Sequence, residues 1–230
     1  MIGDFKTRSL ETERLDRGEF TDAEFRRWQK EMWFIHRLFG ETRALRKSVL
    51  REINSNGTNR VYVLDVAAGS GGLLNFLRYA SRGKNVSYYG IEMSPDSARS
   101  IARNGNIAVR GDALSLPFAD ASIDIAFCTL FLHHLNQDDA ITMLRELRRV
   151  SRRKFFVIDL DRRILPYLAY KFLGRFLLQR FTRQDGALSI KRAYRADELR
   201  KIAQRSGLEQ VSIERSAVGR LILSAEAGDA

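Results

Sequence analysis

The chain has 230 residues, of which 44% are hydrophobic, and this length is ample for one domain with a single large core. A single cysteine, Cys128, excludes an internal disulfide, and together with three histidines it offers no ligand set for a structural zinc site, so we predict no metal. The first residues lack the apolar core of a signal peptide, and no uncharged apolar stretch approaches the roughly 18 residues of a membrane span, so we expect a cytoplasmic protein.

The net charge of +11 is concentrated in one segment. Residues 141–205 contain 18 Lys and Arg against 6 Asp and Glu, whereas the rest of the chain contains 21 against 22. Such a segment suits an anionic membrane surface, an anionic substrate or carrier, or nucleic acid, and a solvated basic face without any partner is also common. Composition alone leaves these four interpretations open.

Residues 1–59 are predicted to form a polar arm followed by a helical cap. The arm spans residues 1–20, and Thr21 and Glu24 then have the spacing of a capping box that opens a helix. Apolar side chains at spacings of three and four predict one buried stripe that ends at Gly40. The stripe consists of Phe25, Trp28, Met32, Ile35 and Phe39.

A second helix is predicted to follow, with Thr42 as its cap. Leu45, Val49 and Ile53 would form its buried side, and the polar residues 54–59 are typical of a turn-rich linker. The two helices either cover a substrate site or simply pack on the sheet that follows.

The most informative stretch is residues 61–72, which read V-Y-V-L-D-V-A-A-G-S-G-G. An apolar strand pattern runs through Asp65, small residues continue to Gly72, and a helical pattern begins immediately afterwards. Small residues let the backbone approach a ligand closely, and the free N–H groups at a helix start favour a carboxylate or phosphate. The stretch therefore predicts a nucleotide-type binding site, although an ordinary strand-to-helix turn can also require glycine.

A second apolar strand pattern, residues 86–91, is followed by Glu92, about 20 residues after Gly71. A carboxylate at this place is suited to accept hydrogen bonds from ribose hydroxyls, which fits a dinucleotide or S-adenosylmethionine. A dinucleotide loop needs a third glycine three residues after Gly71, and this chain has Leu74 there. The spacing therefore disfavours a dinucleotide.

The remaining pattern alternates strands with helices, which is typical of a parallel sheet covered on both faces. Ser94 and Pro95 mark one helix start, with proline at the first helical position. We expect further strands near residues 106–110, 123–129, 154–160, 208–215 and 219–225, and helices near 71–81, 95–104, 137–150 and 196–206.

Residues 161–193 interrupt this alternation and are predicted to form a helical, lid-like insertion. Its core, residues 162–183, is crowded with aromatic and aliphatic side chains, and Lys171 and Arg175 lie four residues apart on one helix face. A basic amphipathic helix of this kind either lies in a membrane interface, roofs an apolar substrate pocket, or buries its apolar side on the core.

At this point the chain resembles the class I S-adenosylmethionine-dependent methyltransferases. Residues 65–71, D-V-A-A-G-S-G, are similar to their D-x-G-x-G-x-G loop, with Ala67 in place of the first glycine. This departure requires an unstrained backbone at Ala67. Glu92 matches the family's ribose-binding acid, and residues 111–113 and 123–135 resemble its third and fourth motifs, so four motifs occur in the family's order.

The resemblance implies a three-layer, Rossmann-like α/β fold with a mostly parallel seven-stranded sheet and an antiparallel last strand. The methyltransferase domain would span residues 60–230. It also implies which residues bind S-adenosylmethionine. These are Asp65, Ala67, Ala68, Gly69, Ser70 and Gly71 for the methionine part, Glu92 with Met93 beside it for the ribose, Asp112 and Ala113 for the adenine, and Thr129 and Leu130 at the methyl-transfer site.

Two histidines follow the fourth predicted strand, at the sheet edge where ligands bind in open α/β folds. Either His133 or His134 is a candidate general base near neutral pH, and Asp159, at the end of the fifth strand, could orient one imidazole. The same His-His-Leu sequence is also a general feature of the family, and its role there can be structural.

The strand exit at residues 129–132, T-L-F-L, lacks the Asn/Asp-Pro-Pro-aromatic turn of methylases that act on adenine amino groups. No RNA-binding module is visible either, so nucleic acid is disfavoured as a partner.

More narrowly, residues 131–135 and 180–194 resemble a bacterial subgroup of methyltransferases encoded beside type III polyketide synthases, and more distantly quinone-pathway methyltransferases. That similarity implies O-methylation of an apolar phenolic or quinol-type small molecule. An RNA or protein methyltransferase recruited by residues 141–205, and a non-catalytic cofactor-binding protein, are the alternatives.

Overall fold

A computed structural model describes residues 5–55 and 59–227, so residues 56–58 of the predicted linker lie outside the described part. Its centre is a seven-stranded sheet in the order β3-β2-β1-β4-β5-β7-β6. Only β7 runs antiparallel to its neighbours, β5 and β6, as the sequence predicts. The strands are β1 (Val61–Val66), β2 (Val86–Glu92), β3 (Ile107–Arg110), β4 (Ile123–Thr129), β5 (Ser151–Leu160), β6 (Val211–Arg215) and β7 (Arg220–Glu226).

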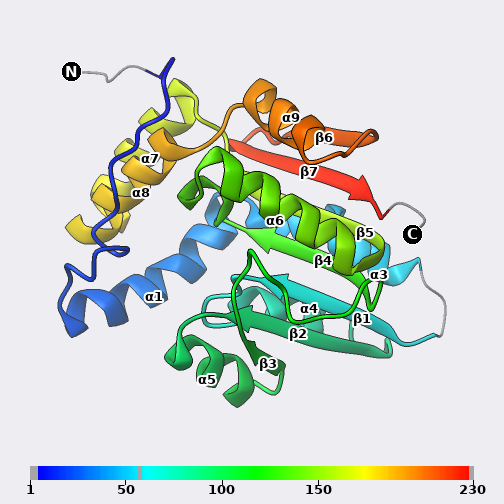
Figure 1. The fold of residues 1–230 in the computed structure, drawn as a ribbon. Helices are drawn as coiled ribbons and strands as arrows, with labels where there is room; N and C mark the ends of the chain where they lie inside the picture. The colour runs from blue at the N-terminus through cyan, green and yellow to red at the C-terminus, as the bar shows by residue number, and fades with distance from the viewer. Residues whose placement is uncertain (1–4, 56–58, 228–230) are drawn as a thin grey trace.

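Helices cover both faces of this sheet and make a three-layer fold (Figure 1). One face carries α2 (Glu41–Lys47), α3 (Val49–Asn54), α4 (Gly72–Ala80) and α5 (Pro95–Arg103), whose apolar side chains share a core with β1 and β4. The other face carries α6 (Gln137–Val150) and α9 (Ala196–Arg205), which build a second core. Cys128 lies fully buried in this second core, as its place in an apolar strand indicates.

A third group of helices lies beyond one end of the sheet, where the strands β4 and β5 finish (Figure 1). It consists of α1 (Asp22–Leu38), α7 (Ile164–Leu177) and α8 (Arg180–Arg192), together with the arm. These elements share a separate small core that includes Phe5, Ile35 and Tyr170. The predicted insertion is therefore two helices, and it packs on α1 and the arm.

The capping predictions are confirmed at α1 and α5. Thr21 Oγ1 accepts a hydrogen bond from the backbone N–H of Glu24 at 3.2 Å, and the Glu24 carboxylate accepts one from the backbone N–H of Thr21 at 2.8 Å. Ser94 caps α5, and Pro95 is its first residue.

The predicted cap at Thr42 is wrong, because α2 begins at Glu41 and Thr42 lies in its first turn. Gly40 has φ of 92° and lets the chain re-enter a helix at once. The predicted second helix is also broken at Ser48, whose backbone is not helical, into α2 and α3.

Two strand starts differ from the prediction by three residues. β5 starts at Ser151, directly after α6, because Ser151 pairs with Ile123 and the two arginines that follow form ion pairs with Asp124 and Glu52. β6 starts at Val211 rather than near 208, because Leu208 turns into the core after the left-handed Gly207. Within the described part of the chain, no helix combines the length and apolar character needed to cross a membrane.

Candidate active site

In the loop that follows β1, three of five consecutive residues have a left-handed backbone conformation. They are Ala67 (φ 57°), Gly69 (φ 55°) and Gly71 (φ 80°). The expectation of an unstrained backbone at Ala67 is therefore wrong, since an L-residue adopts this region at a cost. A Cβ on Gly71 would come within 3.2 Å of Ile101, whereas a Cβ on Gly69 would point into open space. The loop is thus folded tightly, with room left above Gly69 for a ligand.

Two carboxylates lie beside this loop. Asp65, at the end of β1, is buried, and its Oδ1 has no hydrogen-bond partner among the described residues. Glu92, at the end of β2, accepts a hydrogen bond from the backbone N–H of Gly69 at 2.6 Å. Burial raises the pKa of Asp65 well above its ordinary value, and the nearby Glu92 raises it further; burial also raises the pKa of Glu92. A positively charged ligand in this place would let both carboxylates ionise.

The other predicted cofactor residues lie along the same edge of the sheet, after β2, β3 and β4. Met93 and Asp112 are exposed, whereas Ala113 and Thr129 are buried. Asp112 Oδ1 accepts a hydrogen bond from the backbone N–H of Leu114 at 2.9 Å, which holds its carboxylate close to the loop after β3. Leu130 has φ of 50° and is the point where the chain turns out of β4.

Leu130 also lines a pocket with a cavity volume of about 110 Å³ that is partly open to solvent. One wall is α1, and the predicted apolar stripe on α1 faces the pocket through Trp28, Met32, Ile35 and Phe39. The opposite wall is the insertion, with Pro166 and Tyr170 of α7 and residues 182, 185, 186, 189 and 190 of α8. Of the two predicted N-terminal helices, the first therefore covers a pocket and the second packs on the sheet.

His133 lies in the wall of this pocket, on a short 3₁₀ turn after β4 (Leu132–His134). Its Nδ1 is 2.7 Å from Asp159 Oδ1, and its backbone N–H donates to Asp159 Oδ2 at 2.9 Å. Burial alone would raise the pKa of Asp159, but attraction by His133 and hydrogen bonds from His133 and Leu160 hold it below its ordinary value. The ionised Asp159 therefore fixes the proton of His133 on Nδ1 and leaves Nε2 as the free nitrogen.

The comparisons with known proteins agree with this geometry. A family model described as a methyltransferase domain matches residues 64–158. Magnesium protoporphyrin IX methyltransferase (ChlM) from Synechocystis PCC 6803, solved with bound SAH, is similar with a TM-score of 0.63 and 18% identity, covering 93% of this chain and 99% of that one. The DszA carbon methyltransferase is similar with a TM-score of 0.65 and 13% identity, covering 93% of this chain and 62% of that one. A possible histamine N-methyltransferase from Thermotoga maritima is similar with a TM-score of 0.57 and 17% identity, covering 90% of this chain and 99% of that one. The curated proteins contain no match.

Residues 64–158 are a methyltransferase domain. The domain is of class I, and its cofactor is S-adenosylmethionine. The unpartnered Asp65 Oδ1 and the nearby Glu92 fit this cofactor, because it carries a positively charged amine and sulfonium. The names of the three similar structures include a porphyrin methyltransferase, a carbon methyltransferase and a possible N-methyltransferase, so the shared fold does not select the acceptor of this methyltransferase domain.

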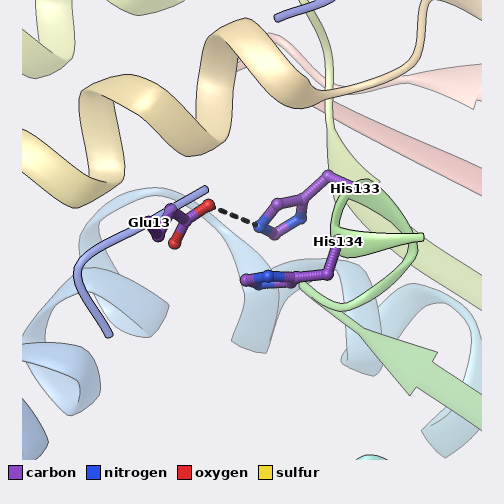
Figure 2. Close-up of side chains that lie close together, drawn as sticks. All are labelled: Glu13, His133 and His134. Atoms are coloured by element: carbon purple, nitrogen blue, oxygen red, sulfur yellow. Dashed lines mark ion pairs between the residues drawn. The ribbon is translucent and has the colours of Figure 1, made fainter. Parts of the chain in front are cut away.

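Two acidic residues of the arm complete the site, and sequence reasoning missed both. Glu13 is buried, and its Oε1 lies 3.8 Å from His133 Nε2 (Figure 2). Asp16 Oδ2 lies 3.0 Å from His134 Nδ1. Burial raises the pKa of Glu13 to about 7, whereas the hydrogen bond and attraction of His134 outweigh burial and lower the pKa of Asp16 to about 2. Neither residue belongs to a periodic pattern, so no sequence signal could have placed them here.

The arm is attached to the insertion by polar contacts. The backbone N–H groups of Arg14 and Leu15 donate to the carboxylate of Asp185 at 3.2 and 2.9 Å. Arg8 donates to the carbonyl oxygen of His133 at 2.5 Å and to Tyr194 Oη at 2.9 Å. The arm therefore joins α8 to the turn that carries both histidines.

Glu13, His133 and His134 also have the composition of a cation site, since one ligand atom from each lies within 4.8 Å of the others. A guanidinium nitrogen of Arg192 already lies 3.4 Å from Glu13 Oε1 and 2.8 Å from Asp16 Oδ2. This arginine supplies the positive charge that a metal ion would bring and would repel a second cation. The arrangement therefore favours a proton-exchanging cluster over a metal centre.

Proposed function

We propose that the protein methylates the hydroxyl oxygen of an apolar small molecule of phenolic or quinol type. The observation that carries this proposal is that one apolar pocket contains both Leu130, at the predicted methyl-transfer site, and His133, whose Nδ1 is held by Asp159. An apolar acceptor would be bound by the walls from α1 and α7, and its hydroxyl would face the imidazole.

S-adenosylmethionine supplies the methyl group as a sulfonium, and its transfer is an in-line displacement in which the bond from carbon to sulfur breaks as the bond from carbon to oxygen forms. The protein holds the acceptor oxygen in line and removes its proton. His133 Nε2 would accept that proton, and Asp159 would stabilise the resulting imidazolium. Glu13, 3.8 Å from the same nitrogen, would then accept the proton from the imidazolium.

The bacterial subgroup associated with type III polyketide synthases suggests particular acceptors, namely alkylated resorcinols and hydroquinones. The pocket supports this proposal through its apolar walls from α1 and α7. Polar side chains also line the pocket, among them Glu13, Asp185 and Arg220.

The basic segment gives less support to an RNA or protein acceptor. Eight of its 18 Lys and Arg form ion pairs with acids of the protein, so a large part of its charge is already neutralised. These eight are Arg149, Arg152, Arg153, Lys154, Arg162, Arg163, Arg192 and Arg205. Nucleic-acid binding depends on free cations that reach phosphates.

The test is a calorimetric titration with S-adenosylhomocysteine, with NADH as the control, followed by an acceptor screen. We expect micromolar binding of the former only, and release of S-adenosylhomocysteine with alkylated resorcinols but not with their dimethyl ethers, which lack a proton to remove. Equal turnover of RNA, or cofactor binding without turnover of any phenol, quinol, RNA or protein, would refute the proposed acceptor.

A further inference from the structure

The helix α7 exposes an apolar face to solvent along its whole length. Leu165, Phe172 and Phe176 are 67%, 67% and 71% exposed, and with Leu168 they recur at the spacing of one helix face. The rings of Phe172 and Phe176 pack edge to face, with centroids 5.6 Å apart. We call these four residues the outer face of α7.

This exposure is unusual for such a sequence. A helix with only two charged side chains, such as α7, is ordinarily buried on most of its sides. In α7 only the opposite side, which carries Tyr167, Tyr170 and Gly174, is buried. Ile164, Leu173 and Leu177 are exposed beside the outer face, so the apolar surface is continuous rather than scattered.

The charged side chains of the segment that carries this surface have one sign. Residues 162–184 contain no Asp or Glu. Lys171 and Arg175 are exposed and lie on one flank of the outer face, and Arg180 is exposed just beyond the helix. A second copy of the chain would bring these cations against its own like charges, whereas anionic lipid headgroups would complement them.

We propose that the outer face of α7 inserts into the interface of an anionic lipid membrane. The side chains of Phe172 and Phe176 would enter the acyl boundary, with Lys171 and Arg175 at headgroup level. The helix would lie in the plane of the membrane.

The opposite side of the same helix lines the pocket through Pro166 and Tyr170. A membrane on the outer face would therefore lie one helix away from the acceptor site, and an apolar acceptor dissolved in lipid would be concentrated there. This delivery step rests on the proposed function, whereas the membrane contact itself does not.

The experiment is flotation of the full chain with vesicles of phosphatidylcholine, with and without about one third phosphatidylglycerol. We expect binding to the anionic vesicles only. Replacing Phe172 and Phe176 by Ser should lower the partition coefficient by about tenfold or more for each ring, because the ring no longer leaves water. Replacing Lys171 and Arg175 by Gln should lower it by about fivefold for each charge.

The matched control is Tyr79→Ser, which removes a side chain of similar exposure, 66%, from α4. It should leave vesicle binding unchanged. Failure of the unmodified protein to float, or equal flotation of the Phe172 and Phe176 variant, would overturn the inference. Light scattering that shows a dimer abolished by the Phe variant would instead assign the surface to a second copy.

Calorimetry with S-adenosylhomocysteine separates this inference from the proposed function. Intact cofactor binding without flotation refutes the membrane contact alone. Delivery predicts that the Phe variant loses activity only towards a long-chain resorcinol in vesicles and retains it towards a short-chain, water-soluble one. Equal loss towards both would refute delivery.

Discussion

At the scale of single residues, Ala67 occupies a backbone region that glycine adopts more easily. Its φ of 57° places it in the left-handed region, within the loop that follows β1. Leu130 is in the same region, with φ of 50°, at the predicted methyl-transfer site. Both positions store strain beside the cofactor edge of the sheet, where a well-defined loop shape matters more than local stability.

We predict that Ala67→Gly stabilises the protein by about 0.5–1 kcal/mol. Relief of the left-handed conformation is worth roughly 1–2 kcal/mol, and the greater freedom of glycine in the unfolded chain offsets part of it. Urea unfolding measures the difference. Ala68→Gly is the control, because Ala68 does not have positive φ, and it should destabilise by about 0.5–1 kcal/mol. Equal destabilisation by both changes would contradict the argument.

His133 and His134 differ in what their rings contact. His133 is buried and paired with Asp159, whereas His134 pairs with Asp16 of the arm. The structure therefore separates two histidines that the sequence could not separate.

We predict that His133→Gln lowers kcat by about 10²–10⁴-fold while the affinity for S-adenosylhomocysteine stays unchanged. His134→Gln should change kcat by less than about tenfold. The loss in His133→Gln should shrink for phenols that are already ionised at the assay pH, because they need no base. A loss that is the same for acidic and ordinary phenols would indicate a structural role for His133.

At the scale of elements, α7 and α8 meet through a glycine. A Cβ on Gly186 of α8 would lie 2.1 Å from Tyr170 Oη and 2.5 Å from its Cζ, so only glycine lets the ring lie against α8. Tyr170 Oη also donates to the carbonyl oxygen of Thr182 at 2.8 Å. This contact sets the shape of the pocket wall.

We predict that Gly186→Ala destabilises the protein by about 1–3 kcal/mol and raises KM for the acceptor, because Tyr170 must move and its hydrogen bond to α8 is lost. Gly174→Ala on α7 is the control. There a Cβ would come no closer than 3.3 Å to Leu178, and alanine favours the helix. Thermal unfolding and steady-state kinetics test both variants. An unchanged KM in Gly186→Ala would show that the contact between Tyr170 and Gly186 does not shape the acceptor pocket.

At the scale of the whole molecule, the buried carboxyl of Glu13 links the arm to the rest of the chain. It faces His133, His134, Arg192 and Asp16. Its pKa is raised to about 7 by burial, so between pH 4.5 and 7 the folded protein keeps a proton that the unfolded chain releases. The free energy of unfolding therefore falls as the pH rises through this window.

We predict that Glu13→Gln gains stability relative to the unmodified protein as the pH rises from about 5 to 8, by up to roughly 3 kcal/mol. Asp16 stays ionised over this range, because its pKa is lowered to about 2, and does not contribute to the slope. Glu11→Gln, an exposed change on the same arm, should follow the unmodified protein at each pH. If the free energies of unfolding of Glu13→Gln and of the unmodified protein changed in parallel with pH, Glu13 would not be protonated in the folded protein.

The sequence predicts the sheet well, because strand periodicity and the glycine loop after β1 are local signals. It misplaces the start of α2 and the break at Ser48, since these depend on how Gly40 packs on Val218, in the turn before β7, and on how α2 and α3 pack on the sheet. It also misses Glu13 and Asp16 entirely. Their partners lie more than a hundred residues away, and a polar arm carries no period that could reveal such contacts.

The contacts of the arm also order the events of biosynthesis. Glu13 leaves the ribosome early, but its partners Ser189 and Arg192 are made about 176 and 179 residues later. Residues 61–160 contain strands β1 to β5 and can begin to collapse while the arm still has nothing to bind. The half of the site predicted to bind the cofactor is therefore synthesised before the half that would bind the acceptor.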